Sequence, residues 1–184
     1  MFRLICLVSV VSLTAAVLLA APVPKNTLPA LGKTNGNTLI KEYKEKLVID
    51  ASSEWNGWPI ANAFDSDEKT SWYSISGESA TNGKEPWVRV RFPVNDTVRR
   101  VTILGNRDPQ WPDGYTATEG KLEYLDADEK VLAKEDLVGT GDKHDFEHTP
   151  NVPLAGVRAI RFTITKDKAT GGGSCVSVGE FQVE

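Results

Sequence analysis

Short segments in which apolar and polar residues alternate recur along the chain, and this pattern constrains the fold more than any other feature. The clearest segment is Trp87–Phe92, where Val88, Val90 and Phe92 fall on one face and the remaining side chains fall on the other. Clusters of Gly, Pro, Asn and Asp separate such segments, and no long segment has helical periodicity. The pattern predicts an all-β protein.

Several further segments have the character of half-buried strands. Antiparallel strands in this number usually form two sheets that face each other. We therefore expect an antiparallel β-sandwich of the jelly-roll type, with one helical turn at Trp58–Phe64. The other predicted strands are Val98–Leu104, Gly120–Leu125, Val131–Ala133, Val157–Thr165 and Val176–Val183.

The first residues have the composition of a secretory signal peptide. Arg3 supplies a positive charge, and Leu4–Leu19 is almost wholly apolar and is followed by small residues. The apolar run is shorter than the roughly 20 residues of a membrane span. We expect cleavage of residues 1–20, a flexible leader at 21–38 that is rich in Pro, Gly, Asn and Thr, and a single domain at 39–184. The mature protein would be secreted, periplasmic or on the cell surface, and an uncleaved N-terminal anchor is the alternative.

Removal of the signal would leave a domain that must fold without an internal disulfide. Cys6 lies within the signal, so Cys175 is the only thiol of the mature chain. The remaining length of about 160 residues is enough for one hydrophobic core. The formal net charge is −4, and loss of Arg3 with no acid makes the mature chain slightly more negative. This acidity argues against nucleic acid and anionic membranes as partners, and we expect no membrane insertion of the mature domain.

The segment Ala51–Tyr73 holds potential ligands for a hard metal ion. Asp65, Asp67 and Thr70 are spaced so that one tight turn can direct two carboxylates and a hydroxyl at a common centre, and calcium takes about six to eight such oxygens. The spacing is not that of an EF-hand, which requires Gly and Glu where this chain has Thr70 and Ser76. An ordinary turn, in which the carboxylates accept backbone N–H groups, is the alternative interpretation.

Four features follow one another in an order that is shared with a known family. They are an opening signature at Ala51–Ser53 and Asn62–Tyr73, strands at Trp87–Phe92 and Val98–Leu104, and a closing strand with an acidic residue at Val178–Phe181. This order resembles the coagulation-factor C-type, or discoidin, domains, and among them the family-32 carbohydrate-binding modules. The resemblance covers residues 47–184 and implies a galactose-binding-like sandwich.

The resemblance also implies a structural calcium ion held by side chains and backbone carbonyls. Glu180 would supply the carboxylate that the loop lacks, and the ion would join segments over 100 residues apart, which carries a larger entropic benefit than a local closure. Ser66 stands where the family usually has Gly, and a side chain there strains the turn. The implied ligands are the Asn62 carbonyl, the Asp65 carboxylate, a carbonyl or carboxylate oxygen of Asp67, an oxygen of Thr70, the Gly179 carbonyl and the Glu180 carboxylate.

Aromatic and planar polar residues in two loops make a glycan the expected ligand. Trp55 and Trp58 flank Asn-Gly in the first loop, and residues 106–115 form a second loop with aromatics, amides and charged groups. An aromatic ring suits the apolar face of a pyranose, and the polar groups suit its hydroxyls. By resemblance to galactose-binding members, Arg107 and Glu68 would bind hydroxyls. The candidate ligand-binding residues are Trp55, Trp58, Glu68, Arg107, Asp108, Trp111 and Tyr115.

Other conspicuous residues are better explained by structure than by function. We call the segment that holds Asp65, Asp67 and Thr70 the predicted metal loop, or metal loop. Trp72 follows this loop directly and Trp87 begins a strand, so we expect both to be structural. His144 and His148 would face one zinc ion only on a helix, and the surrounding Gly- and Pro-rich segment has no helical pattern. Cys175 has no neighbouring base or positive charge in the sequence, which predicts an unreactive thiol.

These features predict a secreted, noncatalytic recognition module, stabilised by calcium, that binds a glycan on a polysaccharide, glycoprotein or cell surface. The alternative is a cell-surface adhesion or protein-binding domain on the same fold. A glycosidase is disfavoured because it needs two placed carboxylates, whereas the acids that can be placed here cluster in the metal loop. The sequence assigns neither a particular sugar nor an oligomeric state.

Overall fold

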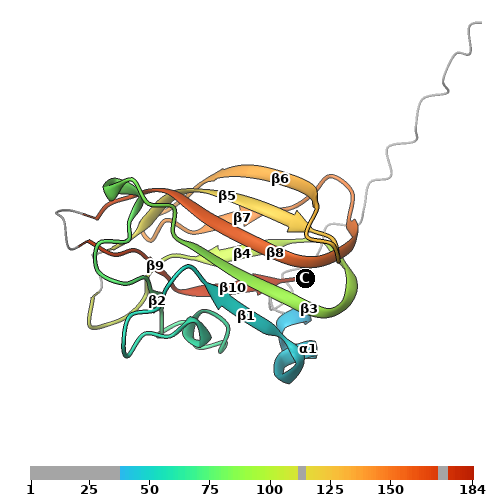
Figure 1. Cartoon of the computed structure of the whole chain (residues 1–184), viewed down its shortest axis with the longest axis horizontal. Helices are drawn as coiled ribbons and strands as arrows, with labels where there is room; N and C mark the ends of the chain where they lie inside the picture. The colour runs from blue at the N-terminus through green and yellow to red at the C-terminus, as the bar shows by residue number, and fades with distance from the viewer. Residues whose placement is uncertain (1–37, 112–114, 170–173) are drawn as a thin grey trace, which may run out of the picture. The chain divides into compact units, whose positions relative to one another are not determined.

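Ten β-strands and a few short helical segments make up the part of the chain that the computed structural model describes, which is residues 38–111, 115–169 and 174–184. The predicted signal and all but the last residue of the predicted leader lie outside the described residues. No helix within the described ranges is long and apolar enough to cross a membrane. The elements are α1 Thr38–Tyr43, η1 Lys44–Lys46, β1 Val48–Ala51, η2 Ile60–Ala63, β2 Trp72–Tyr73, η3 Ala80–Asn82, β3 Trp87–Val98, β4 Val101–Leu104, β5 Ala117–Leu125, β6 Val131–Val138, β7 Phe146–His148, β8 Leu154–Asp167, β9 Ser177–Val178 and β10 Glu180–Val183 (Figure 1).

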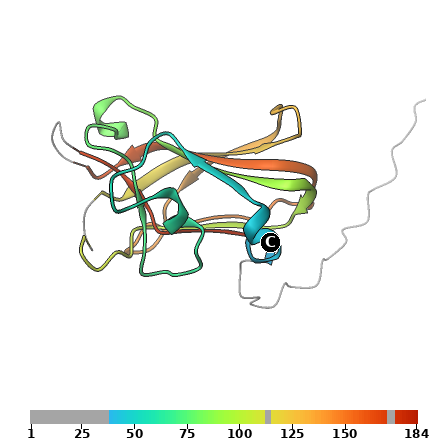
Figure 2. The same cartoon turned by 60° about the horizontal axis from the view of Figure 1, so that its bottom comes forward.

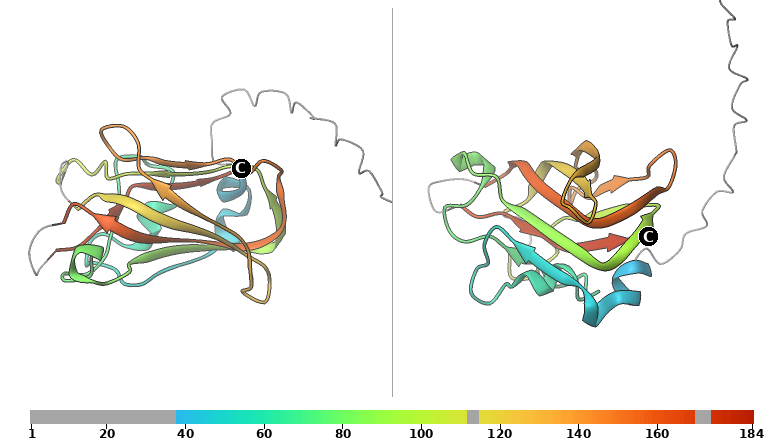
Figure 3. Two further views of the ribbon diagram at one scale, coloured as in Figure 1. Left: turned by 90° about the horizontal axis from the view of Figure 1, so that it is seen from above. Right: turned by 45° about the vertical axis from the view of Figure 1, so that its right-hand side comes forward.

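The strands form two layers that face each other (Figures 2 and 3). One layer is a five-stranded sheet of order β1-β3-β8-β5-β6, and the other is a three-stranded sheet of order β10-β4-β7. The short strands β2 and β9 form a separate pair. All of these strand pairs are antiparallel. The predicted antiparallel β-sandwich is therefore confirmed.

The alternation that predicted β3 is visible in its burial. Val88 and Val90 are fully buried and Phe92 is 1% exposed, so these three side chains enter the core. On the opposite face, Arg89 donates two hydrogen bonds to the carboxylate of Asp50 on the neighbouring β1. The strand is half-buried because its two faces meet different environments.

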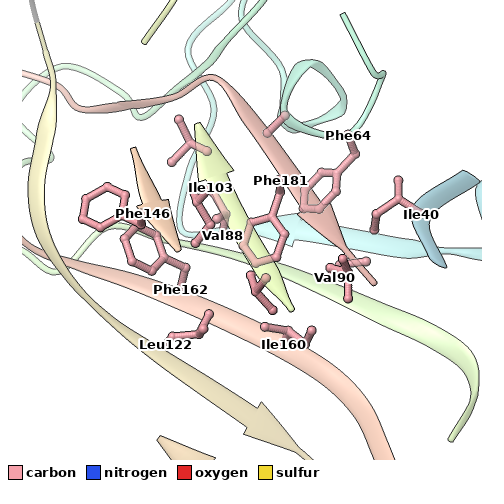
Figure 4. Packing of buried hydrophobic residues seen from close by; sticks show 14 of the residues in the cluster. Ile40, Phe64, Val88, Val90, Ile103, Leu122, Phe146, Ile160, Phe162 and Phe181 are labelled. Atoms are coloured by element: carbon pink, nitrogen blue, oxygen red, sulfur yellow. The ribbon is translucent and has the colours of Figure 1, made fainter. Parts of the chain in front are cut away.

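The core fills the space between the two sheets with aromatic and branched side chains (Figure 4). Phe162 of β8 meets Phe146 of β7 across the sandwich, with their ring centroids 4.9 Å apart. Phe64, which follows η2, stacks on Phe181 of β10 at 5.4 Å. Trp72 is fully buried and its indole N–H donates to a backbone carbonyl at 2.8 Å, which confirms its structural role. The η2 turn itself lies within the predicted helical turn.

Several predicted strand limits were wrong. The predicted strand at 98–104 is interrupted after Val98, where β3 ends and β4 begins, and β6 continues beyond its predicted end to Val138. The predicted closing strand is divided at Gly179, where an added Cβ would collide with the carbonyl of Gly105. The strands β1, β2 and β7 were not predicted. The three-residue β7 has one buried side chain, Phe146, in a polar segment, so it carries no visible alternation.

The two histidines share no helix. His148 lies on β7, and its Nδ1 is 2.5 Å from the hydroxyl of Tyr124. His144 lies in the preceding turn, with a φ of 54°. Their placement excludes the arrangement of two histidines on one helical face that a zinc site of this spacing requires.

The close packing of Phe181 gives a direct test of the core. Phe181→Ala removes a fully buried ring that stacks on Phe64, and we expect a loss of about 3–5 kcal/mol in the free energy of unfolding. Urea denaturation followed by tryptophan fluorescence measures this loss. Val94→Ala is the control, because Val94 is 48% exposed and should change the stability by less than about 0.5 kcal/mol. Equal effects of the two substitutions would contradict this packing.

Candidate functional site

Loops from distant parts of the sequence gather at one end of the sandwich. The segment between β1 and β2, residues 105–111 and 115–116 between β4 and β5, and residues 174–176 before β9 lie at this end, on the left of Figures 1 and 2. We call this the loop end. It holds a cavity of about 230 Å³ among its side chains. The cavity is lined by Trp55, Trp58, Tyr73, Trp111, Tyr115 and Cys175.

A tight turn presents the first two tryptophans. The backbone N–H of Trp58 donates to the carbonyl of Trp55 at 2.9 Å, and Gly57 between them has a φ of 93°. Only glycine adopts this left-handed conformation without strain. The N–H of Trp55 donates to the carbonyl of Tyr73 at 2.8 Å, which fixes the turn against β2. The Asn-Gly pair in the sequence is thus the local cause of the tryptophan placement.

The aromatic rings of the cavity contact one another in series. Tyr73 meets Trp58 at a centroid distance of 5.6 Å and Tyr115 at 6.0 Å, and Tyr115 meets Trp111 at 6.2 Å, all in edge-to-face arrangements. Such arrangements are favourable for aromatic pairs. Trp55 and Trp111 are 37% and 46% exposed, whereas Tyr73 is 3% exposed. The cavity therefore has an accessible aromatic rim and a buried floor.

Cys175 forms part of this floor. Its side chain is buried, and burial raises the pKa of the thiol to about 11. The thiol is therefore protonated at neutral pH, which agrees with the expectation that it is unreactive.

Asn106 organises the loop end through its buried amide. Its Oδ1 accepts hydrogen bonds from the hydroxyls of Ser71 and Tyr73, each at 3.1 Å, and from the N–H of Asp108 at 2.9 Å. Its Nδ2 donates to the carbonyl of Trp111 at 2.6 Å. The sequence analysis assigned Asn106 no individual role, although Asn followed two residues later by a turn residue is a common Asx-turn pattern.

Asp108 and Arg107 are both held by protein partners. The Asp108 carboxylate accepts the indole N–H of Trp58 at 2.6 Å and the N–H of Gln110 at 2.8 Å. The guanidinium of Arg107 makes a bidentate pair with Asp145 at 2.7 and 2.8 Å and also donates to the carbonyl that precedes the loop, at 3.0 Å. The hydrogen bond to Asp145 raises the pKa of Arg107. Asp145 is a partner that the sequence analysis missed.

The structure places the predicted ligand-binding residues as follows. Trp55, Trp58, Trp111 and Tyr115 line the cavity together. Asp108 contacts Trp58, and Arg107, which directly precedes Asp108 in the same loop, pairs with Asp145 before β7. Glu68 is exposed in the metal loop, and its charge contributes to raising the pKa of Arg107. Their contacts with a ligand stay predictions.

The predicted metal loop brings several oxygen atoms together. The hydroxyl of Thr70 lies 2.9 Å from Oδ2 of Asp65, 2.9 Å from the carbonyl of Asp67 and 3.3 Å from the carbonyl of Asn62. Oδ1 of Asp65 accepts the N–H of Asp67 at 2.8 Å. Four of the six predicted ligand residues therefore converge in one turn.

Glu180 faces this turn from the last strand. Pairing of Trp72 with Val178 brings the strand beside the loop, and the backbone of Ser66 hydrogen-bonds the Glu180 carboxylate. Glu180 is fully buried, and burial together with the charge of Asp65 raises the pKa of its carboxyl to about 8. Ser66 has a φ of 66°, the left-handed conformation that favours glycine, so the expected strain at this position is present.

The donor set suits a hard cation. Within the described ranges, no three His, Cys, Asp or Glu side chains have the spacing of a metal site, so the set depends on the carbonyls of Asn62, Asp67 and Gly179. Gly179 directly precedes Glu180, and its N–H donates to the carbonyl of Leu104 at 2.8 Å. Carboxylate, carbonyl and hydroxyl oxygens are the ligands that calcium takes.

The fold is a two-layered antiparallel sandwich with its candidate site in the loops at one end. The sequence profile of the F5/8 type C domain matches residues 48–181, and the chain belongs to this family. The resemblance to discoidin domains is confirmed. No curated protein sequence matches the chain closely enough to count as a relative.

Solved structures of similar fold include several carbohydrate-binding modules. The family 32 module from C. perfringens NanJ, in complex with galactose, has a TM-score of 0.58 and 17% identity over 76% of this chain and 94% of that chain. A fucose binding module of Streptococcus pneumoniae has a TM-score of 0.57 and 15% identity, covering 74% and 89%. Chitosan-binding module 1 of a chitosanase/glucanase from Paenibacillus sp. IK-5 has a TM-score of 0.53 and 22% identity, covering 74% and 93%. Identities this low show a shared fold.

The role of Asn106 can be tested by truncation. Asn106→Ala leaves the buried hydroxyls of Ser71 and Tyr73 without their acceptor, and we expect a loss of about 2–3 kcal/mol in the free energy of unfolding. Gln110→Ala, at an exposed position of the same loop, is the control and should change it by less than about 0.5 kcal/mol. Urea denaturation of both variants measures the difference. A neutral Asn106→Ala would contradict the organising role.

Proposed function

We propose that this domain is a secreted, noncatalytic module that binds carbohydrate through the aromatic cavity at its loop end. The observation that carries the proposal is the convergence of four predicted ligand-binding aromatics, from two loops far apart in sequence, on one cavity with an exposed rim. Rings placed in this way can stack on the apolar face of a pyranose. The similar modules from C. perfringens and S. pneumoniae, described as binding galactose and fucose, support the same class of ligand.

Polar contacts to the sugar would come from Arg107 and Glu68. A guanidinium has five N–H donors, and the contacts of Arg107 with Asp145 and the backbone use three of them. The pairing holds the side chain in one orientation, which lowers the entropic cost of donating to a ligand hydroxyl. Glu68 would accept from a second hydroxyl, as the family resemblance implies.

The chemistry of the site favours binding over hydrolysis. A glycosidase needs one carboxylic acid that can protonate the leaving group and a second carboxylate opposite it. Asp108, the carboxylate hydrogen-bonded to the cavity tryptophan Trp58, also accepts the backbone N–H of Gln110. Both of its oxygens are therefore engaged in positioning the loop, which supports a noncatalytic role.

We further propose that calcium stabilises the domain. Asn62, Asp65, Asp67, Thr70, Gly179 and Glu180 would hold the ion. When bound, the ion supplies positive charge beside the buried Glu180 carboxylate and links the loop to the last strand. The gathering of the loop oxygens around Thr70, with a buried acid facing them, supports this proposal.

The calcium proposal predicts a stability that depends on the ion. An ion that binds only the folded protein, at 100 times its dissociation constant, stabilises it by about 2.7 kcal/mol. We therefore expect chelation to lower the Tm of the wild-type protein by several °C, and Asp65→Asn to remove this response. Differential scanning calorimetry with calcium and with chelator measures both effects.

Asp126→Asn is a matched control for the metal loop. Asp126 lies in the β5–β6 turn and, like Asp65, accepts the backbone N–H of the residue two positions later. This variant should keep the full response to chelation even if its Tm is lower. A wild-type melting curve that chelation leaves unchanged would refute the calcium proposal.

Glycan binding can be tested at the rim of the cavity. A glycan array probed with the purified protein in calcium identifies the ligand class, and calorimetric titration with the best ligand then compares variants. Trp111→Ala removes an exposed stacking surface, and we expect at least a tenfold weaker affinity because aromatic contacts of this kind dominate binding energies. Leu132→Ala, on β6 and also 45% exposed, should bind as the wild type does.

One outcome would contradict glycan binding, and another would contradict the location of the glycan site. An array without signal, from protein with the expected melting transition, would favour the protein-binding or adhesion alternative. Unchanged affinity in Trp111→Ala would place the glycan site outside this cavity.

A further inference from the structure

The floor of the cavity is formed by groups with little capacity to bind hydroxyls. Among the lining residues, Tyr73 and Cys175 are each 3% exposed, whereas Trp55 and Trp111 are 37% and 46% exposed. The thiol is a weak donor and a weak acceptor. A ligand group that reaches the floor therefore meets ring carbons and sulfur.

The polar atoms of two lining aromatics are already used within the protein. The hydroxyl of Tyr73 donates to the amide of Asn106 at 3.1 Å, and the indole N–H of Trp58 donates to Asp108 at 2.6 Å. Each of these rings has one polar hydrogen to donate. The two rings therefore contribute mainly apolar surface to the cavity.

Arg107 and Asp108 are not among the residues that line the cavity. Asp108 is hydrogen-bonded to Trp58 and Gln110, and Arg107 is paired with Asp145. A hydroxyl that reached the floor would leave water without gaining equivalent hydrogen bonds from Tyr73 or Cys175, which is unfavourable. A methyl group would gain from the same transfer.

The size of the cavity limits how much of a ligand it can take. Pockets for drug-sized ligands usually measure about 300–1,000 Å³, and this cavity measures about 230 Å³. This volume can accommodate one substituent and part of a sugar ring. The remainder of the ligand would lie against the exposed rings of Trp55 and Trp111.

We propose that the cavity selects saccharides that carry a methyl-terminated substituent, either an acetamido group or a deoxy methyl group, and that this substituent occupies the aromatic floor. The inference rests on the proposed glycan binding and adds its specificity. A cavity of this kind would discriminate between ligands that share a ring but differ in one methyl group.

Matched ligand pairs test the inference and distinguish the two sources of the methyl group. N-acetyl-D-glucosamine and N-formyl-D-glucosamine differ by the acetamido methyl, and L-fucose and L-galactose differ by a hydroxyl at C6. Calorimetric titrations use the full chain as purified from a secreting host, in calcium. We expect the methyl-bearing member of at least one pair to bind about tenfold more tightly, as one methyl in an apolar pocket commonly gives.

A pair of substitutions at Cys175 tests where the methyl group lies. Cys175→Ser places a hydroxyl on the floor and should reduce the preference within the selected pair by several fold. Cys175→Ala keeps the floor apolar and should retain the preference. The comparison within each variant is independent of small losses in stability, and the wild-type titrations stand even if Cys175→Ser does not fold.

The possible results separate failure of the inference from failure of the proposed function. Equal or tighter binding of both the formyl and the hydroxyl partners, with clear binding of saccharides, would overturn the inference and leave the proposed function in place. Absence of binding to every saccharide on the array and in the titrations would overturn the proposed function and the inference together. A preference that Cys175→Ser leaves unchanged would overturn the placement on the floor.

Discussion

The amide of Asn106 joins the separate segments on which the candidate site depends. Four hydrogen bonds connect this one side chain to the β2 region, to the start of its own loop and to the backbone of Trp111. Because the amide is buried, each bond forms in a medium where an unsatisfied polar group is costly. The arrangement converts loops, which are usually variable in conformation, into a fixed frame for the cavity aromatics.

A second set of contacts closes the same end of the sandwich from the C-terminal side. The β2–β9 pair brings the last strand to the loop of Asp65, and Glu180 lies buried where the two segments meet. A cation at this position would link residues that are far apart in sequence. A link that closes a long loop carries a larger entropic benefit than one that closes a short loop. The proposed glycan site and the proposed calcium site thus share strand β2 and the segments that flank it.

The sequence predicted the architecture well because most of the fold depends on burial of one face of a strand. The alternation in β3 identified its core residues without ambiguity, and a tryptophan between a turn and a strand indicated that Trp72 is buried. Contacts that depend on tertiary pairing could not be predicted in this way. Asp145 meets Arg107 only because β7 pairs with β4, and β7 is too short to show a pattern. The organising role of Asn106 likewise requires that Ser71 and Tyr73 be placed beside it by the fold.

The five tryptophans of the chain report directly on whether the aromatic cavity at the loop end binds the glycan. Their indole ¹⁵N–H resonances can be followed by NMR during titration with the ligand that the array identifies. Binding in the cavity should shift the resonances of Trp55, Trp58 and Trp111, with little change for the buried Trp72 and for Trp87 on the outer face of β3. Shifts confined to Trp72 and Trp87, or none at saturating ligand, would contradict it.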